Sequence, residues 1–129
     1  MEFIDLKTQY LRYQSEIDAR MRAVLDHGKF IMGPEIAEME AALANYVGVK
    51  HCLSVASGTD SLEIALRALD IGPGDEVITV PFTWISSAEV ILLVGAKPVF
   101  VDIEAESYNM DVNLIERAIT PRTKAIIPV

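Results

Sequence analysis

The fold is decided by residues 76–103, which read EVITVPFTWISSAEVILLVGAKPVFVDI. The first five residues are mostly β-branched and stop at Pro81, which is typical of a strand end. A mostly apolar helix is predicted over residues 85–94, and Gly95 closes it. PVFVDI, at 98–103, then predicts another buried strand. Because both strands are continuous apolar runs, the pattern indicates a mostly parallel sheet with helices covering both faces.

The flanking sequence continues this alternation. Upstream, KHCLSVA at 50–56 predicts a strand and DSLEIALRAL at 60–69 predicts a helix. Downstream, VNLIERAI at 112–119 predicts a short helix and TKAIIPV at 123–129 predicts a last strand. Residues 50–129 are therefore predicted to form the first part of an α/β domain. Ligands of such domains bind at the carboxyl ends of the strands.

Residues 1–49 have a helical rhythm instead. The apolar spacing in SEIDARMRAVLDH predicts a helix over residues 15–27 that Ser15 caps. A second helix is predicted from Pro34, which suits a first helical turn, up to Gly48. We interpret the apolar stripes of both helices as faces that pack in a core. The sequence is thus divided into an N-terminal helical segment and the α/β domain that follows it.

Composition excludes several classes of protein. The chain has 129 residues, of which 51% are hydrophobic and 23% charged, as expected of a folded domain. Its net charge of −8 argues against nucleic-acid binding. The sequence has neither a membrane span nor the apolar core of a signal peptide. With Cys52 alone, and His27 and His51 lacking metal-site spacing, we expect no disulfide, no metal site and a cytoplasmic setting.

Residues 57–60, SGTD, stand between the predicted strand and its helix and allow two interpretations. Asp60 followed by Glu63 matches a capping box, in which side chains satisfy the helix start. Alternatively, Gly58 permits a close backbone approach, Ser57 and Thr59 add hydroxyls, and the helix N-terminus attracts a phosphate. The segment has neither a Walker A ending nor the dinucleotide-binding glycine spacing. From these residues alone, capping and phosphate binding both stay open.

Three further side chains follow strands at the predicted ligand edge. Trp84, the only tryptophan, either stacks on a flat ligand or covers the core. Phe82 is expected to cover the core. Asp102 either binds a ligand hydroxyl or caps the next turn, and the structural role is favoured. The sequence has no G-x-S-x-G elbow, so it gives no support for hydrolase chemistry of that kind.

Taken together, these motifs resemble the start of the DegT/StrS family of sugar-nucleotide aminotransferases, which use pyridoxal 5'-phosphate (PLP). The resemblance runs through FIDL, FIMGPEIAEMEAALANYVGVKH, VASGTDSLEIALRAL, GPGDEVITVPFTWISSAEVILLVGAKPVFVDIE and ITPRTKAIIPV, in that order. It implies part of the large α/β domain of a fold-type I aminotransferase. It also implies that Gly58, Thr59 and Asp60 bind the cofactor phosphate, Asp60 through its backbone N–H, and that Trp84 stacks on the cofactor ring.

The same resemblance implies an activity. The amino group of an amino acid, often glutamate in this family, would pass to a keto group of a nucleotide-linked (UDP) sugar. The chain resembles enzymes that aminate a 3-keto sugar acid for O-antigen or lipopolysaccharide assembly, and such enzymes are usually homodimers. The resemblance places four residues near the sugar substrate: Lys29, Phe30, Met32 and Gly33.

The Schiff-base lysine is expected beyond Val129, because family members are much longer than this chain. None of the lysines present matches its place, namely Lys7, Lys29, Lys50, Lys97 and Lys124. We therefore expect no catalytic residue within the chain and no transamination by these residues alone. Two alternatives stay open. Some relatives carry histidine in place of the lysine and act as sugar dehydratases, and a truncated chain would be a non-catalytic interaction module with exposed sheet edges.

Overall fold

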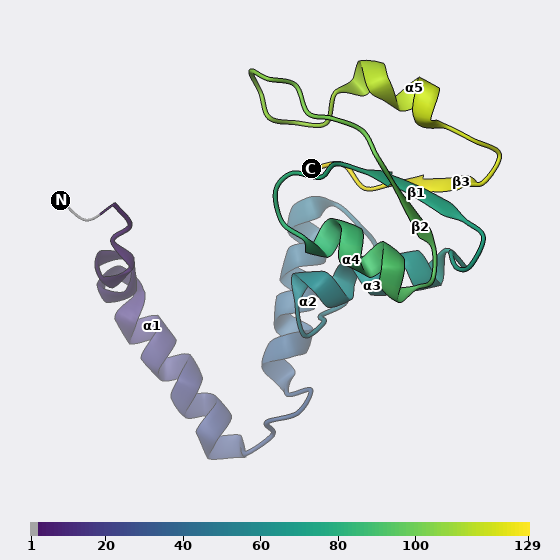
Figure 1. Cartoon of the computed structure of the whole chain (residues 1–129). Coiled ribbons are helices and arrows are strands. Elements are labelled where there is room, and N and C mark those ends of the chain that lie inside the picture. The colour runs from purple at the N-terminus through teal and green to yellow at the C-terminus, as the bar shows by residue number, and fades with distance from the viewer. Residues whose placement is uncertain (1–2) are drawn as a thin grey trace. The chain divides into compact units, whose positions relative to one another are not determined.

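The computed structural model describes residues 3–129 and divides into two compact units, Met1–Ser54 and Val55–Val129. Each unit is described by itself. Figure 1 labels the elements, which are α1 (Leu6–His27), α2 (Pro34–Val47), α3 (Gly58–Ala68), β1 (Glu76–Thr79), α4 (Ser86–Leu93), β2 (Lys97–Phe100), η1 (Val112–Leu114), α5 (Ile115–Ala118) and β3 (Thr123–Ile126). Within residues 3–129, no helix is both long enough and apolar enough to cross a membrane.

The first unit begins with α1, which starts earlier than the sequence pattern predicts. Asp5 caps it, because its carboxylate accepts hydrogen bonds from the backbone N–H and the hydroxyl of Thr8 at 2.9 and 2.6 Å. Ser15, the predicted cap, lies inside the helix, so that prediction is wrong. The helix α2 begins at Pro34 and ends before Gly48, as predicted.

Polar contacts, rather than a core, connect the two helices of the first unit. Arg20 pairs with Glu38 at 2.7 Å, and the His27 ring contacts Glu35 at 2.9 Å. None of the described residues in α1 or α2 is buried. The core-packing interpretation of their apolar stripes is therefore wrong for this chain. The stripe residues that stay exposed are Ile17, Met21, Leu25, Met39, Leu43 and Tyr46.

The second unit is built on a parallel sheet with the strand order β2-β1-β3, which confirms the predicted fold class. The central strand β1 pairs with β2 in the register Glu76↔Lys97. The strand predicted over residues 50–56 is not formed. A strand requires a ladder with a neighbour, and among the described residues no strand pairs with this segment. Its Ser54 N–H instead donates to the Glu40 carboxylate at 2.7 Å.

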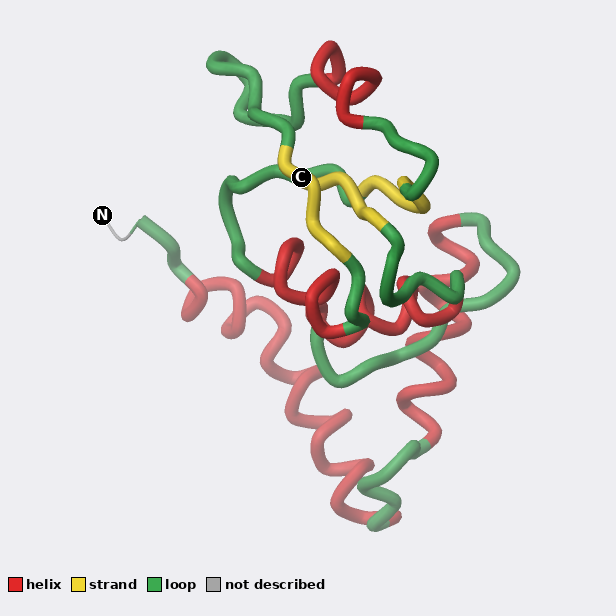
Figure 2. Tube along the Cα trace, turned by 45° about the vertical axis from the view of Figure 1, so that its right-hand side comes forward, coloured by secondary structure: helices red, strands yellow, loops and turns green. Residues whose placement is uncertain are grey.

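Hydrophobic clusters lie on both faces of this sheet. Val77 and Ile78, successive residues of β1, point to opposite faces and belong to different clusters. Figures 1 and 2 show α3 and α4 on one side of the sheet and α5 on the other. One cluster comprises Leu66, Ile71, Val77, Val90, Ile91, Val94 and Ala96. The other comprises Ile78, Val80, Val101 and Met110.

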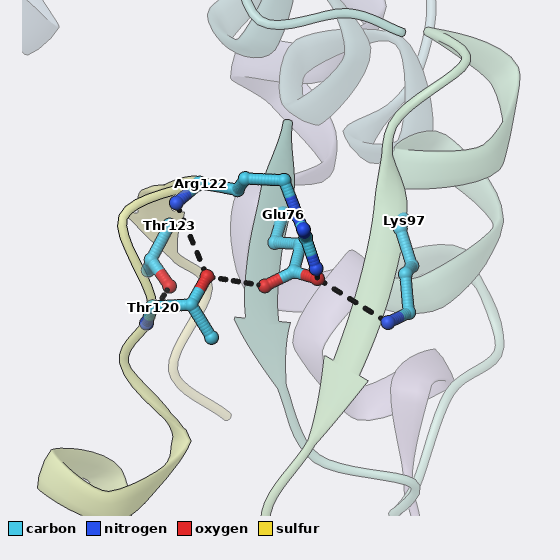
Figure 3. Close-up of polar contacts among 5 residues, drawn as sticks. All are labelled: Glu76, Lys97, Thr120, Arg122 and Thr123. Carbon is cyan, nitrogen blue, oxygen red and sulfur yellow. Dashed lines mark hydrogen bonds and ion pairs between the residues drawn. The ribbon is translucent and has the colours of Figure 1, made fainter. Parts of the chain in front are cut away.

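A buried carboxylate closes the amino edge of the sheet (Figure 3). Glu76 is 2% exposed and accepts hydrogen bonds from Thr120 at 2.6 Å, from Arg122 at 2.7 Å and from Lys97 at 3.2 Å. These partners come from β2 and from the segment that leads into β3. The Thr120 and Arg122 hydrogen bonds hold the pKa of Glu76 at about 2. This contact therefore fixes all three strands at the edge opposite the candidate site.

Candidate functional site

The starts of α3 and α4 meet at the carboxyl edge of the sheet. The Thr59 hydroxyl, in the first turn of α3, lies 2.9 Å from the hydroxyl of Ser86, the first residue of α4. Because only residues 80–85 separate the carboxyl end of β1 from α4, this hydrogen bond places the SGTD segment at that edge. Parallel α/β sheets bind their ligands at this edge.

Ser57 caps α3, and Asp60 does not. The Ser57 hydroxyl accepts a hydrogen bond from the Asp60 N–H at 3.1 Å, and the helix begins at Gly58. The predicted Asp60–Glu63 capping box is therefore wrong, and Glu63 instead pairs with Arg67 at 2.7 Å. Ser57 and Asp60 have the same capping-box spacing as Asp60 and Glu63, but lie one helical turn closer to the N-terminus. Ser57 is therefore the residue that caps the helix.

Two backbone donors remain at the start of α3. Within residues 3–129, the N–H groups of Gly58 and Thr59 donate no hydrogen bond. The Asp60 N–H already has a partner in Ser57, so it is a weaker candidate donor than the resemblance implies. A side-chain carbon added at Gly58 would meet no atom within 4 Å, so the space beside it is open.

This donor set fits a phosphate group. A phosphate monoester only accepts hydrogen bonds when it is fully ionised, and it carries negative charge. The two N–H groups can donate, as can the Thr59 hydroxyl when Ser86 is the donor in their contact, and the N-terminal end of the α3 dipole is positive. With the open space beside Gly58, these features meet the requirements of the phosphate of PLP.

The aromatic residues after β1 differ in their surroundings. Trp84 is 74% exposed, so it does not cover the core of this unit. The Phe82 ring packs against Tyr108, with ring centroids 5.9 Å apart. Asp102 accepts a hydrogen bond from the N–H of the next residue, Ile103, at 2.8 Å. Trp84 is thus the aromatic side chain after β1 that is most available to a flat ligand.

The residues predicted to contact the sugar lie in the other unit, between α1 and α2. Phe30 and Met32 are 69% and 71% exposed, and Met32 has a positive φ of 51°. The Lys29 N–H donates to the His27 ring at 3.0 Å. Gly33 is buried, and a side-chain carbon there would lie 2.6 Å from the Lys29 carbonyl oxygen. Only glycine fits this turn without a shift, so Gly33 shapes the segment that presents Phe30 and Met32.

Sequence reasoning missed the capping role of Ser57 and the part played by Ser86 at the carboxyl edge. Ser57 was detectable, because the spacing Ser57-x-x-Asp60 is itself a capping signal. Ser86 gave no sign of its own, because its partner Thr59 is 27 residues away in the chain and no local pattern encodes that contact.

Comparison with known proteins assigns the chain to a family. The model of the DegT/DnrJ/EryC1/StrS aminotransferase family matches residues 12–129. The chain belongs to this family. The chain matches the N-terminal portion of the family members, which agrees with the resemblance found in the sequence.

Individual relatives agree. The chain is 57% identical over all 129 residues to the UDP-2-acetamido-2-deoxy-3-oxo-D-glucuronate aminotransferase of Pseudomonas aeruginosa, and it covers 36% of that protein. A crystal structure of a family aminotransferase from Brucella abortus is 45% identical with a TM-score of 0.94, over 99% of this chain and 36% of that one. A sugar aminotransferase of Streptococcus pneumoniae in its PLP form is 41% identical with a TM-score of 0.78, over 84% of this chain and 29% of that one. The chain thus spans about a third of the length of its relatives.

Proposed function

We propose that this protein is a PLP-dependent aminotransferase that transfers an amino group, with glutamate as donor, to the keto group of a UDP-linked sugar. The observation that carries the proposal is the 57% identity, over the whole chain, to an aminotransferase that is named for a UDP-linked 3-oxo sugar acid. The donor set at the start of α3 supports it, because it fits the phosphate of PLP. The corresponding role is the making of an amino sugar for surface polysaccharide, in the cytoplasm.

In this proposal the chain's own residues hold and orient the cofactor. The N–H groups of Gly58 and Thr59 and the Thr59 hydroxyl bind the phosphate, and Asp60 lies in the same turn. The exposed Trp84 offers its ring as a stacking surface. When bound, PLP supplies the electron sink that amino-group transfer requires. The segment at Lys29, Phe30, Met32 and Gly33 contacts the sugar.

A direct test uses the full-length protein with PLP, glutamate and the UDP-linked 3-keto sugar acid. We expect 2-oxoglutarate and the amino sugar to form in equal amounts, and omission of glutamate to stop both. If the sugar instead loses water and no 2-oxoglutarate appears, the protein is a dehydratase and the proposal is wrong.

The lysine that anchors the cofactor is proposed to lie beyond Val129. Borohydride reduction of the PLP-loaded full-length protein, followed by peptide mass spectrometry, tests this placement. We expect the cofactor mass on a peptide outside residues 1–129. Cofactor found on one of the five lysines of this chain would contradict the placement.

We also propose that α1 is covered by a second copy of the protein. Leu6, Tyr10, Ile17 and Met21 share one face of α1 by helical spacing and are between 38% and 67% exposed. Apolar surface of this kind usually marks a contact with another protein surface. In the full-length protein, Met21→Glu is expected to shift the mass measured by light scattering from dimer to monomer. Ala19→Glu, on the opposite face, is the control, and a parent that is already monomeric would refute the proposal.

A further inference from the structure

A buried hydroxyl links the two helix starts at the candidate cofactor site. Ser86 is only 7% exposed, yet its hydroxyl does not cap its own helix, because α4 begins after Ile85 without a side-chain cap. It lies instead 2.9 Å from the Thr59 hydroxyl on α3. Among the described residues, Thr59 is the hydrogen-bond partner of this hydroxyl. A buried polar group whose partner lies on a neighbouring helix fixes the distance between the two helices.

The direction of this hydrogen bond has a consequence for an anion at the site. Each hydroxyl has one proton to donate. If the Thr59 proton points to Ser86, it is not available to a ligand. If Ser86 donates to Thr59, the Thr59 proton is free to point toward the open space beside Gly58. A bound phosphate only accepts, so it selects the second arrangement, and the buried Ser86 hydroxyl keeps a satisfied partner in it.

The contact also acts on the aromatic segment. Trp84 is two residues before Ser86, so the two Cα atoms are at most about 7 Å apart. Anchoring Ser86 to α3 therefore restricts where the Trp84 ring can lie relative to Thr59. One hydrogen bond thereby relates the group that would bind the phosphate to the group that would stack on the ring.

We propose that Ser86 is a positioning residue for cofactor binding. It donates its proton to the Thr59 hydroxyl, so that Thr59 donates to the cofactor phosphate, and it holds the Trp84 segment in register with α3. This inference rests on the proposed function, because it requires PLP to bind at the start of α3.

The test compares two ligands in the full-length protein: PLP and pyridoxal, which has the same ring without the phosphate. Ser86→Ala is expected to weaken PLP binding about 2- to 10-fold, the effect of one hydrogen bond, and to weaken pyridoxal binding less, because pyridoxal depends only on the position of the Trp84 ring. Ser87→Ala is the matched control, because Ser87 is the next residue of α4 and is 9% exposed. It is expected to change neither. Absorbance titration gives both dissociation constants without any measurement of activity.

Two further variants keep the outcome clear. Ser86→Cys retains the size of the side chain but donates weakly, so it should reproduce the loss for PLP even if the alanine variant folds poorly. In a Thr59→Val background, Ser86→Ala should add no further loss, because the partner hydroxyl is already absent. Equal losses for PLP and pyridoxal, or a Ser86→Ala effect no larger than that of Ser87→Ala, would overturn the inference.

The phosphate site and the role of Ser86 are refuted by different results. If Thr59→Val weakens PLP binding while Ser86→Ala and Ser86→Cys do not, the phosphate site stands and the role of Ser86 is wrong. If the parent binds PLP no better than pyridoxal, or Thr59→Val has no effect, the phosphate site itself is wrong, and the inference is overturned with it.

Discussion

Glu76→Gln is expected to remove a pH-dependent contribution to the stability of the sheet. The substitution keeps the size of the side chain but removes the charge held between Thr120, Arg122 and Lys97 (Figure 3). The pKa of Glu76 is lowered from 4.5 to about 2, mainly by the hydrogen bond from Thr120, then by Arg122 and less by Lys97, while burial opposes the shift. The carboxylate is therefore ionised in the fold at a pH where it is protonated in the unfolded chain.

The sign of the effect follows from this difference. A carboxyl group with a lowered folded pKa stabilises the fold fully above its unfolded pKa, here 4.5. The contribution is lost as the pH falls toward the folded pKa of about 2. Between these values, unfolding takes up as much as one extra proton. For each pH unit lost in this range, the unfolding equilibrium constant of the parent should therefore rise by up to about tenfold relative to that of Glu76→Gln.

Urea unfolding followed by circular dichroism, from about pH 7 to about pH 3, measures this difference. Asp5 and Glu35 also have lowered pKa values, but they are present in both proteins and cancel in the comparison. Glu106→Gln, at an exposed site, is the control and should follow the parent at every pH. If the gap in stability between parent and Glu76→Gln is the same at both ends of this range, the carboxylate is not linked to folding and the reasoning is refuted.

Three other substitutions test the core, the turn and the site. Ile91→Ala, at a fully buried position, should lower the free energy of unfolding by about 2–5 kcal/mol, whereas Leu92→Ala, at a side chain that is 63% exposed, should have much less effect in the same denaturant titration. Gly33→Ala would place a carbon 2.6 Å from a backbone oxygen and should cost about 1–3 kcal/mol by thermal unfolding, unlike Gly72→Ala, whose nearest neighbour is at 3.6 Å. Trp84→Ala should weaken PLP binding in the full-length protein by about 1 kcal/mol or more, while Trp84→Phe should retain much of it, and equal affinities for all three proteins would remove this side chain from the site.

Strands and helices of the second unit were predictable where buried positions require apolar residues, because these residues form a recognisable pattern. The run EVITV is apolar on both faces since β1 is buried between clusters on both sides of the sheet. The run PVFV also forms a strand, β2, but it lies at the end of the strand order and none of its residues is buried. The start of α1 was not predictable by the same rule. Leu6 and Tyr10 continue the apolar spacing of Ile17 and Met21, but no described residue of this helix is buried, and the capping signal at Asp5 marks its first residue.

The segment at 50–56 shows a second limit. Its apolar residues suit a strand, but strand formation depends on a neighbour that supplies the ladder, and local composition carries no information about that neighbour. For the candidate site, the sequence likewise predicted residue types but not their contacts. SGTD and Trp84 could be singled out as residue types with a possible role, whereas the contact of Thr59 with Ser86 depends on how two helices pack and appears only in the fold.

The two edges of the sheet differ in a way that favours a ligand at the carboxyl edge. At the amino edge, Glu76 has a partner for each carboxylate oxygen, and Arg122 and Thr120 are held in the same network. Both carboxylate oxygens of Glu76 are thereby satisfied. At the carboxyl edge, the N–H groups at the start of α3 have no acceptor within residues 3–129, and a large aromatic side chain, Trp84, is mostly exposed. These N–H groups belong to a helix start, which favours an anion, and the ring offers a flat surface for stacking. The amino edge is therefore built to hold the strands together, and the carboxyl edge keeps the unpaired groups that a phosphate and a flat ring would complete.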